Sequence, residues 1–150
     1  MKKITLVALF TMALVVLITH SAMAAKPLTP EKLDGATIVD ADWVKANLGK
    51  VTVFDVRKKA EYVESHIPGA VSAPYKEKSK KAADFDASKD KLKIGKFPSD
   101  KNAPIVTQCN GERCWKSYKA AVWLVREGYK KVYWFRGGLP EWKAKGFPTE

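Results

Sequence analysis

Short apolar segments that alternate with helical patterns constrain the fold of this chain more than any other feature. Residues 36–40, 51–56, 103–109 and 131–135 are rich in β-branched and aromatic side chains and predict strands, with a further short strand within 67–75. Helical patterns follow at residues 41–49, 58–66, 115–129 and 139–146. Strands that alternate with helices usually pair in parallel. The sequence therefore predicts an α/β fold: one domain with a mostly parallel central sheet flanked by helices.

The first residues predict a processing signal. Lys2 and Lys3 precede an apolar run over residues 4–18, and Ala22-Met23-Ala24 has the small-x-small pattern of a cleavage site. The apolar run is shorter than the ~20 residues that a membrane-spanning helix needs. We therefore expect residues 1–24 to be a secretory signal peptide, residues 25–35 a lead segment, and residues 36–147 the domain. A periplasmic or secreted protein without stable membrane insertion after cleavage would result.

The chain is basic, with 27 Lys and Arg against 16 Asp and Glu, and loss of Lys2 and Lys3 would leave a net charge of +9. In a cytosolic protein such charge would favour nucleic acid as a partner. For an exported protein we expect no nucleic acid, and small anions or an acidic protein fit better. Many lysines lie between Tyr75 and Lys101, a polar stretch that predicts a long loop with one or two helical turns. Its charges are expected to be solvated, or to form one wall of an anion-attracting mouth.

Both cysteines of the chain lie in the segment CNGERCWKS, residues 109–117. Cys109 ends a predicted strand, and a helix is expected to begin shortly after Cys114. Ligands of open α/β sheets bind at the carboxyl ends of strands, and loop N–H groups with a helix N-terminus attract anions. The same positive field, with Arg113 and Lys116 nearby, lowers the pKa of a thiol. Cys109 is therefore a candidate nucleophile, and a buried inert cysteine at a strand end is the alternative.

The spacing of Cys109 and Cys114 leaves their pairing open. In an oxidising compartment two cysteines can form a disulfide if their Cα atoms come within ~7 Å. A bridge across so short a loop adds little stability, so it would indicate redox or reactive chemistry rather than a structural staple. A second cysteine can act as a resolving thiol, attacking a persulfide or a sulfenic acid on the first.

Other chemistries of cysteine fit this sequence poorly. Beyond residue 24 the chain has one histidine, His66, whereas a structural zinc site usually needs four ligands. A phosphatase of this type would need arginine in the sixth place after Cys109, and Trp115 occupies it. We therefore expect neither a metal nor a cofactor.

Three segments together resemble a rhodanese domain. They are DVRKKAEYVESHIPGAVSAPY (residues 55–75), PIVTQCNGERCWKSYKAA (104–121) and GYKKVYWFRGGLPEW (128–142). The resemblance covers residues 36–147 and rests on the order and spacing of the three motifs. It implies a parallel sheet flanked by helices.

The resemblance also implies a reaction. Cys109 would take a sulfane sulfur from a donor such as thiosulfate, carry it as a persulfide, and pass it to cyanide or another thiol. The partners would be a small sulfur-containing anion and a thiol acceptor protein. Asp55 and Arg57 would either orient the cysteine loop or form an ordinary ion pair. The substrate-binding loop would comprise Asn110, Gly111, Glu112, Arg113, Trp115 and Lys116.

The loop departs from the usual pattern of the family, which has an arginine five residues after the cysteine and then a serine. Without a gap these places fall on Cys114 and Trp115; aligned on KSYKAA, they fall on Lys116 and Ser117. Trp115 could cover the cysteine or pack at the helix start. The chain resembles exported rhodanese-like proteins with a second cysteine followed by tryptophan. A thiol-disulfide redox protein and a non-catalytic binding module remain alternatives to sulfur transfer.

Overall fold

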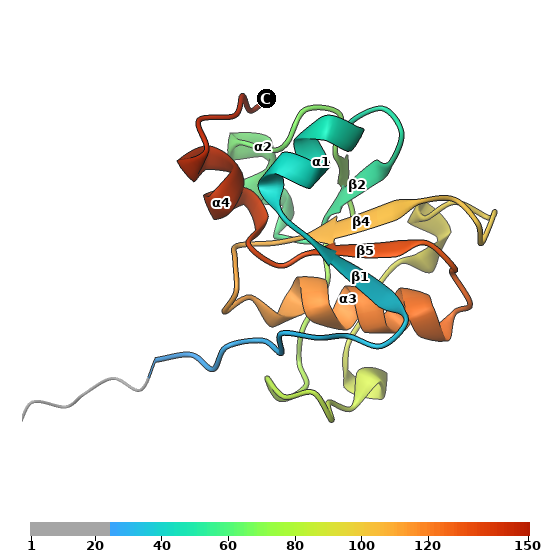
Figure 1. Ribbon diagram of the computed structural model, residues 1–150. Helices are drawn as coiled ribbons and strands as arrows, with labels where there is room; N and C mark the ends of the chain where they lie inside the picture. Colours follow the sequence, from blue (N-terminus) through green and yellow to red (C-terminus); the bar gives the residue numbers. More distant parts are fainter. Residues whose placement is uncertain (1–24) are drawn as a thin grey trace, which may run out of the picture.

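Five parallel strands form one sheet, and helices cover both of its faces (Figure 1). The computed structural model describes residues 25–150, so the predicted signal peptide lies outside the described residues. The strands are β1 (Ala36–Val39), β2 (Thr52–Asp55), β3 (Val71–Ser72), β4 (Ile105–Gln108) and β5 (Val132–Phe135), in the order β1-β5-β4-β2-β3. The prediction of an α/β fold with a parallel sheet is confirmed.

The helices follow the predicted segments closely. They are α1 (Ala41–Asn47), α2 (Lys59–Glu64), α3 (Trp115–Arg126) and α4 (Gly138–Ala144). Helix α2 is shorter than its pattern because the backbone of Ser65 is extended. The predicted long loop after Tyr75 carries two short 3-10 helices, Ala87–Lys89 and Ile94–Lys96. No helix in the described part of the chain is long and apolar enough to cross a membrane.

Strand β4 is buried along its whole length and separates two apolar cores. On one face α3 packs against Phe54 and Trp134, and on the other α1 and α4 pack against Val53 and Phe135 (Figure 1). Side chains of successive strand residues point to opposite faces, which is why neighbours in sequence belong to different cores. Trp134 and Trp142 are fully buried, one in each core.

The sheet register brings the ends of three strands together. Asp55 of β2 lies opposite Gln108 of β4, and Gln108 lies opposite Phe135 of β5. Because all strands are parallel, the segments that follow them leave from the same edge of the sheet. Cys109 and Arg57 therefore emerge side by side, although 52 positions separate them in the sequence.

A buried lysine anchors the insertion of residues 76–101 to α3. The Lys119 side chain is fully buried, and its Nζ lies 2.8 Å from a Glu77 carboxylate oxygen, 2.8 Å from Ser79 Oγ and 3.8 Å from Asp90 Oδ2. Asp90 accepts hydrogen bonds from the Tyr75 hydroxyl and from Ser79. The expectation that the charges of this stretch are solvated is thus wrong for Glu77 and Asp90, because a cation from α3 draws them inward.

Hydrogen bonds decide the protonation of Asp90. Burial acts to raise the pKa of this carboxyl, but hydrogen bonds from Ser79 Oγ and from the backbone N–H groups of Lys78 and Ser79 outweigh burial and lower the pKa. The carboxylate therefore stays charged beside Lys119 at neutral pH. A buried ion pair of this kind is costly to break from one side only.

Replacement of Lys119 by methionine should destabilise the fold. The variant would leave the buried Asp90 and the partly buried Glu77 without a cation, at an expected cost of about 3–5 kcal/mol in the free energy of unfolding. Urea unfolding followed by tryptophan fluorescence would measure it. Exposed Lys130 supplies the matched control, Lys130→Met. Equal stabilities of the two variants would show that the buried lysine does not hold the insertion.

The lowered pKa of Asp90 also predicts an acid-sensitive contribution to stability. Because the folded pKa lies below the unfolded value of about 3.9, the contribution is fully present above that pH. It is lost as the pH falls through the folded pKa. The unfolding free energies of the native protein and Asp90→Asn should therefore draw together as the pH falls below about 3.9. A difference that stays constant with pH would contradict a charged Asp90.

Candidate functional site

Cys109 lies directly after β4, where the chain meets the start of α4. Its side chain is almost fully buried, and its carbonyl accepts a hydrogen bond of 3.0 Å from the backbone N–H of Leu139. Gly138 makes this approach possible, because a Cβ at that position would collide with the Cys109 carbonyl. Gly138 also has a φ of +58°, which a larger residue adopts with strain. The end of β4 is therefore held from α4 as well as from its own sheet.

Cys109 and Cys114 are joined by a disulfide, with Cα atoms 6.1 Å apart. The intervening loop turns at Gly111, a buried glycine with a φ of +90°, whose carbonyl accepts a 2.9 Å hydrogen bond from the N–H of Cys114. Cys114 immediately precedes α3. The pairing that the sequence left open is thus present, and Cys109 requires reduction before it can act as a nucleophile.

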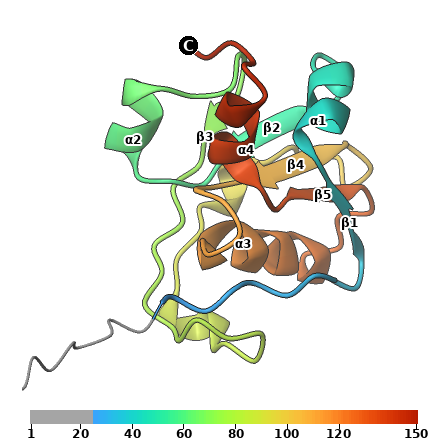
Figure 2. The same ribbon diagram turned by 60° about the vertical axis from the view of Figure 1, so that its left-hand side comes forward.

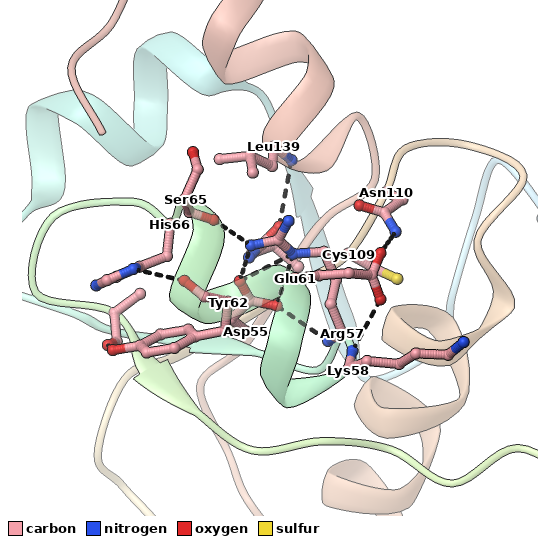
Figure 3. A network of polar contacts seen from close by, with 12 residues as sticks. Asp55, Arg57, Lys58, Glu61, Tyr62, Ser65, His66, Cys109, Asn110 and Leu139 are labelled. Atoms are coloured by element: carbon pink, nitrogen blue, oxygen red, sulfur yellow. Dashed lines mark hydrogen bonds and ion pairs between the residues drawn. The ribbon is translucent and has the colours of Figure 1, made fainter. Parts of the chain in front are cut away.

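Asp55 and Arg57 form a buried ion pair at the end of β2. Arg57 donates from Nε to both carboxylate oxygens at 3.0 Å and from one terminal nitrogen at 2.5 Å (Figure 3). The same nitrogen donates to the Ser65 carbonyl at 2.6 Å, which ties the end of β2 to the turn after α2. Of the two expected roles, the structure shows an ion pair whose hydrogen bonds, within residues 25–150, go to this turn and not to the cysteine loop.

Helix α2 contacts the cysteine loop through Glu61. Its carboxylate accepts a 2.6 Å hydrogen bond from the Asn110 side chain and a 3.1 Å bond from the N–H of Lys58 (Figure 3). Burial acts to raise the pKa of Glu61, but these hydrogen bonds and the charges of Lys116 and Arg57 lower it overall. Glu61 was not among the predicted site residues. The sequence signal that could have identified Glu61 is the Glu61-Tyr62 pair within the motif of residues 55–75.

A cleft of about 350 Å³ opens between α2, the cysteine loop and α4. Of the predicted substrate-binding residues Asn110 lines it, together with Arg57. Lys116 is half-buried in the first turn of α3, and Ser117 lies deeper in that helix, where its hydroxyl accepts from the Trp134 indole at 3.1 Å. The full lining is Arg57, Glu61, Glu64, Ser65, Asn110, Leu139, Pro140 and Lys143.

Glu112, another predicted loop residue, is held by the N-terminal lead and β5. Its carbonyl accepts hydrogen bonds from the backbone N–H of Thr29 at 2.9 Å and from Thr29 Oγ1 at 2.7 Å. Arg136, just after β5, pairs with the Glu112 carboxylate at 2.9 Å and donates to the Thr29 carbonyl. Neither Thr29 nor Arg136 carried a sequence signal, because their contacts join segments far apart in the chain.

The N-terminal lead also accepts hydrogen bonds from the side chains of Arg113 and Trp115. Arg113 donates to the carbonyl of Lys26, and the Trp115 indole donates to the carbonyl of Pro27 at 3.0 Å. Trp115 is 4% exposed and packs edge-on against Tyr118. Trp115 therefore packs at the start of α3 beneath the lead, which runs past this helix in Figure 2.

Comparisons with known proteins agree with this architecture. A sequence profile of the rhodanese-like domain matches residues 40–145. A helix-turn-helix transcriptional regulator of Mycobacterium tuberculosis is 30% identical over 102 residues, which is 68% of this chain but 38% of that protein. A rhodanese domain-containing protein of Drosophila melanogaster is 33% identical over 63% of this chain and 84% of that one. A sulfurtransferase of Allochromatium vinosum is 26% identical over 69% of this chain and 81% of that one.

Solved structures show the same fold. The rhodanese-like domain of an Anabaena protein superposes with a TM-score of 0.56 and 26% identity over 79% of this chain and 80% of that one. A thiosulfate sulfurtransferase of Pseudomonas aeruginosa gives a TM-score of 0.55 at 20% identity, with 77% of this chain and 20% of that one covered. The profile match spans most of the sequence and includes strands β2 to β5, helices α1 to α4 and the cysteine loop. This chain belongs to the rhodanese-like domain family.

Proposed function

We propose that this protein is a sulfurtransferase that carries sulfane sulfur as a persulfide on Cys109. The observation that carries the proposal is the position of Cys109, which directly follows the central strand β4 and begins the loop to α3. Membership of the chain in the rhodanese-like family supports sulfur chemistry, as does the similarity of the chain to the Allochromatium sulfurtransferase. Export guided by residues 1–24 is part of the proposal and would place the protein in an oxidising compartment, periplasmic or extracellular.

Electrostatics favour an anion at this position. Helix α3 spans 12 residues, and its N-terminus follows Cys114 directly. The partial positive charge of that helix end favours a thiolate or persulfide anion nearby. A small sulfur-containing anion would approach through the cleft beside Asn110, whose wall balances Arg57 and Lys143 against Glu61 and Glu64, so the attraction comes from the end of α3 rather than from the cleft wall.

The proposed reaction starts from the reduced pair. The Cys109 thiolate attacks the outer sulfur of thiosulfate, a new S–S bond forms, the original S–S bond breaks, and sulfite leaves with the electron pair. A thiol acceptor or cyanide then attacks the terminal sulfur of the persulfide. That step releases the sulfur to the acceptor and regenerates the Cys109 thiolate.

The disulfide gives Cys114 a role in the same cycle. In the absence of an acceptor, the Cys114 thiolate attacks Cys109 Sγ of the persulfide and displaces hydrosulfide. The product is the disulfide seen between Cys109 and Cys114. A dithiol reductant must reopen the bond before the next sulfur is loaded. The bridge would thus protect a reactive cysteine between turnovers.

Sulfur loading can be tested by intact mass. We expect the protein, reduced with a dithiol and desalted, to release one equivalent of sulfite on addition of thiosulfate and to gain one sulfur atom at early times, before cyanide or Cys114 removes it. Cys109→Ser should gain nothing, because it lacks the nucleophile. The unreduced protein is the control and should also gain nothing. Failure of the reduced native protein to release sulfite from thiosulfate, together with no early gain of sulfur from an organic persulfide, would favour a redox or binding role.

Cys114→Ser separates sulfur transfer from disulfide chemistry. This variant should load sulfur without prior reduction, since Cys109 is then free, and should hold the persulfide longer because nothing within the loop displaces it. Hydrosulfide release, followed with a sulfide-sensitive electrode, should fall by about tenfold or more relative to the native protein. If Cys114→Ser does not load sulfur at all, Cys114 belongs to the loading step and the division of roles is wrong.

A further inference from the structure

We propose that a second cavity, lined by the segment after β3, the insertion, Trp123 of α3 and Lys59 of α2, binds an organic anion that carries an apolar body. The cavity has a volume of about 580 Å³ and lies between the end of the edge strand β3 and the insertion of residues 76–101. Figure 2 shows the insertion, in green to yellow, leaving β3 and running past α3. Volumes of this size are typical of sites for small organic molecules, about 300–1,000 Å³.

Unpaired positive charge surrounds this cavity. None of its five lysines lies within ion-pair distance of a carboxylate in the described residues. The wall has one carboxylate, Asp90, whose charge is already matched by Lys119 and by hydrogen bonds from Tyr75 and Ser79. The net field in the cavity is therefore positive, and an anion would be attracted. The five are Lys59, Lys76, Lys91, Lys93 and Lys96.

The rest of the wall is apolar. Trp123 of α3, Pro74 and Leu92 line the cavity, and Trp123 is held edge-on against Tyr75 with ring centroids 6.2 Å apart. A bare inorganic anion such as thiosulfate would leave these surfaces in water. A ligand with an aromatic or aliphatic body would cover them and gain the free energy of apolar burial. The lining therefore selects for an organic carboxylate, sulfonate or phosphate.

A buried hydroxyl without a partner also marks this wall. Ser72, at the end of β3, is 7% exposed, and its Oγ makes no hydrogen bond within residues 25–150. Its carbonyl accepts a 2.7 Å hydrogen bond from Lys96 Nζ, which brings an ammonium group close to it. The hydroxyl exposes almost no surface, so the polar group that this wall offers to a ligand is the Lys96 ammonium held at the Ser72 carbonyl.

The second cavity is independent of the sulfur chemistry. It shares no lining residue with the cleft between α2, the cysteine loop and α4. A ligand here would serve as an effector or as a second substrate that the enzyme holds, and the site stands on its own observations. If no organic anion binds in this cavity, the persulfide proposal still stands. If Cys109 carries no persulfide, the proposal for this cavity still stands.

Isothermal titration with 2-naphthalenesulfonate tests the site directly. We expect saturable one-to-one binding that weakens with salt. The neutral analogue 2-naphthalenemethanol lacks the anion and inorganic sulfate lacks the apolar body, so each should bind about tenfold more weakly or worse. No saturable binding of the sulfonate, or equal binding of the neutral analogue, would overturn the proposal.

Matched charge variants locate the binding. The double variant Lys91→Gln/Lys93→Gln removes two lysines from the cavity wall and should weaken binding of the sulfonate about tenfold. The control Lys130→Gln/Lys131→Gln removes the same charge from exposed positions outside the cavity and should leave the affinity nearly unchanged. Equal weakening by the two double variants would mean non-specific attraction by net charge and would sink the proposal.

Discussion

The burial of β4 between β2 and β5 is the constraint on which the rest of this structure depends. All four residues of β4 are buried, and the strand pairs in parallel on both sides. The residue that follows such a strand lies at the carboxyl edge of the sheet. There its backbone N–H and C=O groups have no hydrogen-bond partner on a neighbouring strand. The carbonyl of Cys109 finds one in Leu139 of α4 instead. A cysteine thus begins a loop whose first atoms are rigidly placed.

Rigid support of this loop comes from three directions. Glu61 of α2 holds Asn110, Thr29 of the N-terminal lead holds the carbonyl of Glu112, and the disulfide closes the loop onto itself. Rhodanese chemistry as we propose it needs a loop that can present N–H groups to an anion, and preorganised groups do this without a reorganisation cost during the reaction. The lead also takes up the side chains of Arg113 and Trp115. These residues support the loop from outside and do not line the cleft.

Two buried ion networks add to the apolar packing that holds the segments outside the sheet. Arg57 and Asp55 hold the turn after α2, a helix without a fully buried residue. Lys119 holds the insertion through Glu77 and Asp90. Both networks cost desolvation and depend on complete hydrogen bonding. The anchored insertion in turn forms one wall of the lysine-rich cavity beside β3.

The sequence by itself determined the order of strands and helices, the parallel sheet and the place of Cys109, because these depend on local periodicity and on a chain of alternating elements. The motif around Asp55 and Arg57 was likewise visible in the sequence. Only the tertiary structure decided that Cys109 pairs with Cys114, that Glu61 holds Asn110, and that Thr29 and Arg136 brace Glu112. It alone showed that Lys119, in a helix of otherwise regular pattern, is buried. Such contacts join residues distant in sequence, and their energies depend on burial and distance, which a linear pattern does not encode.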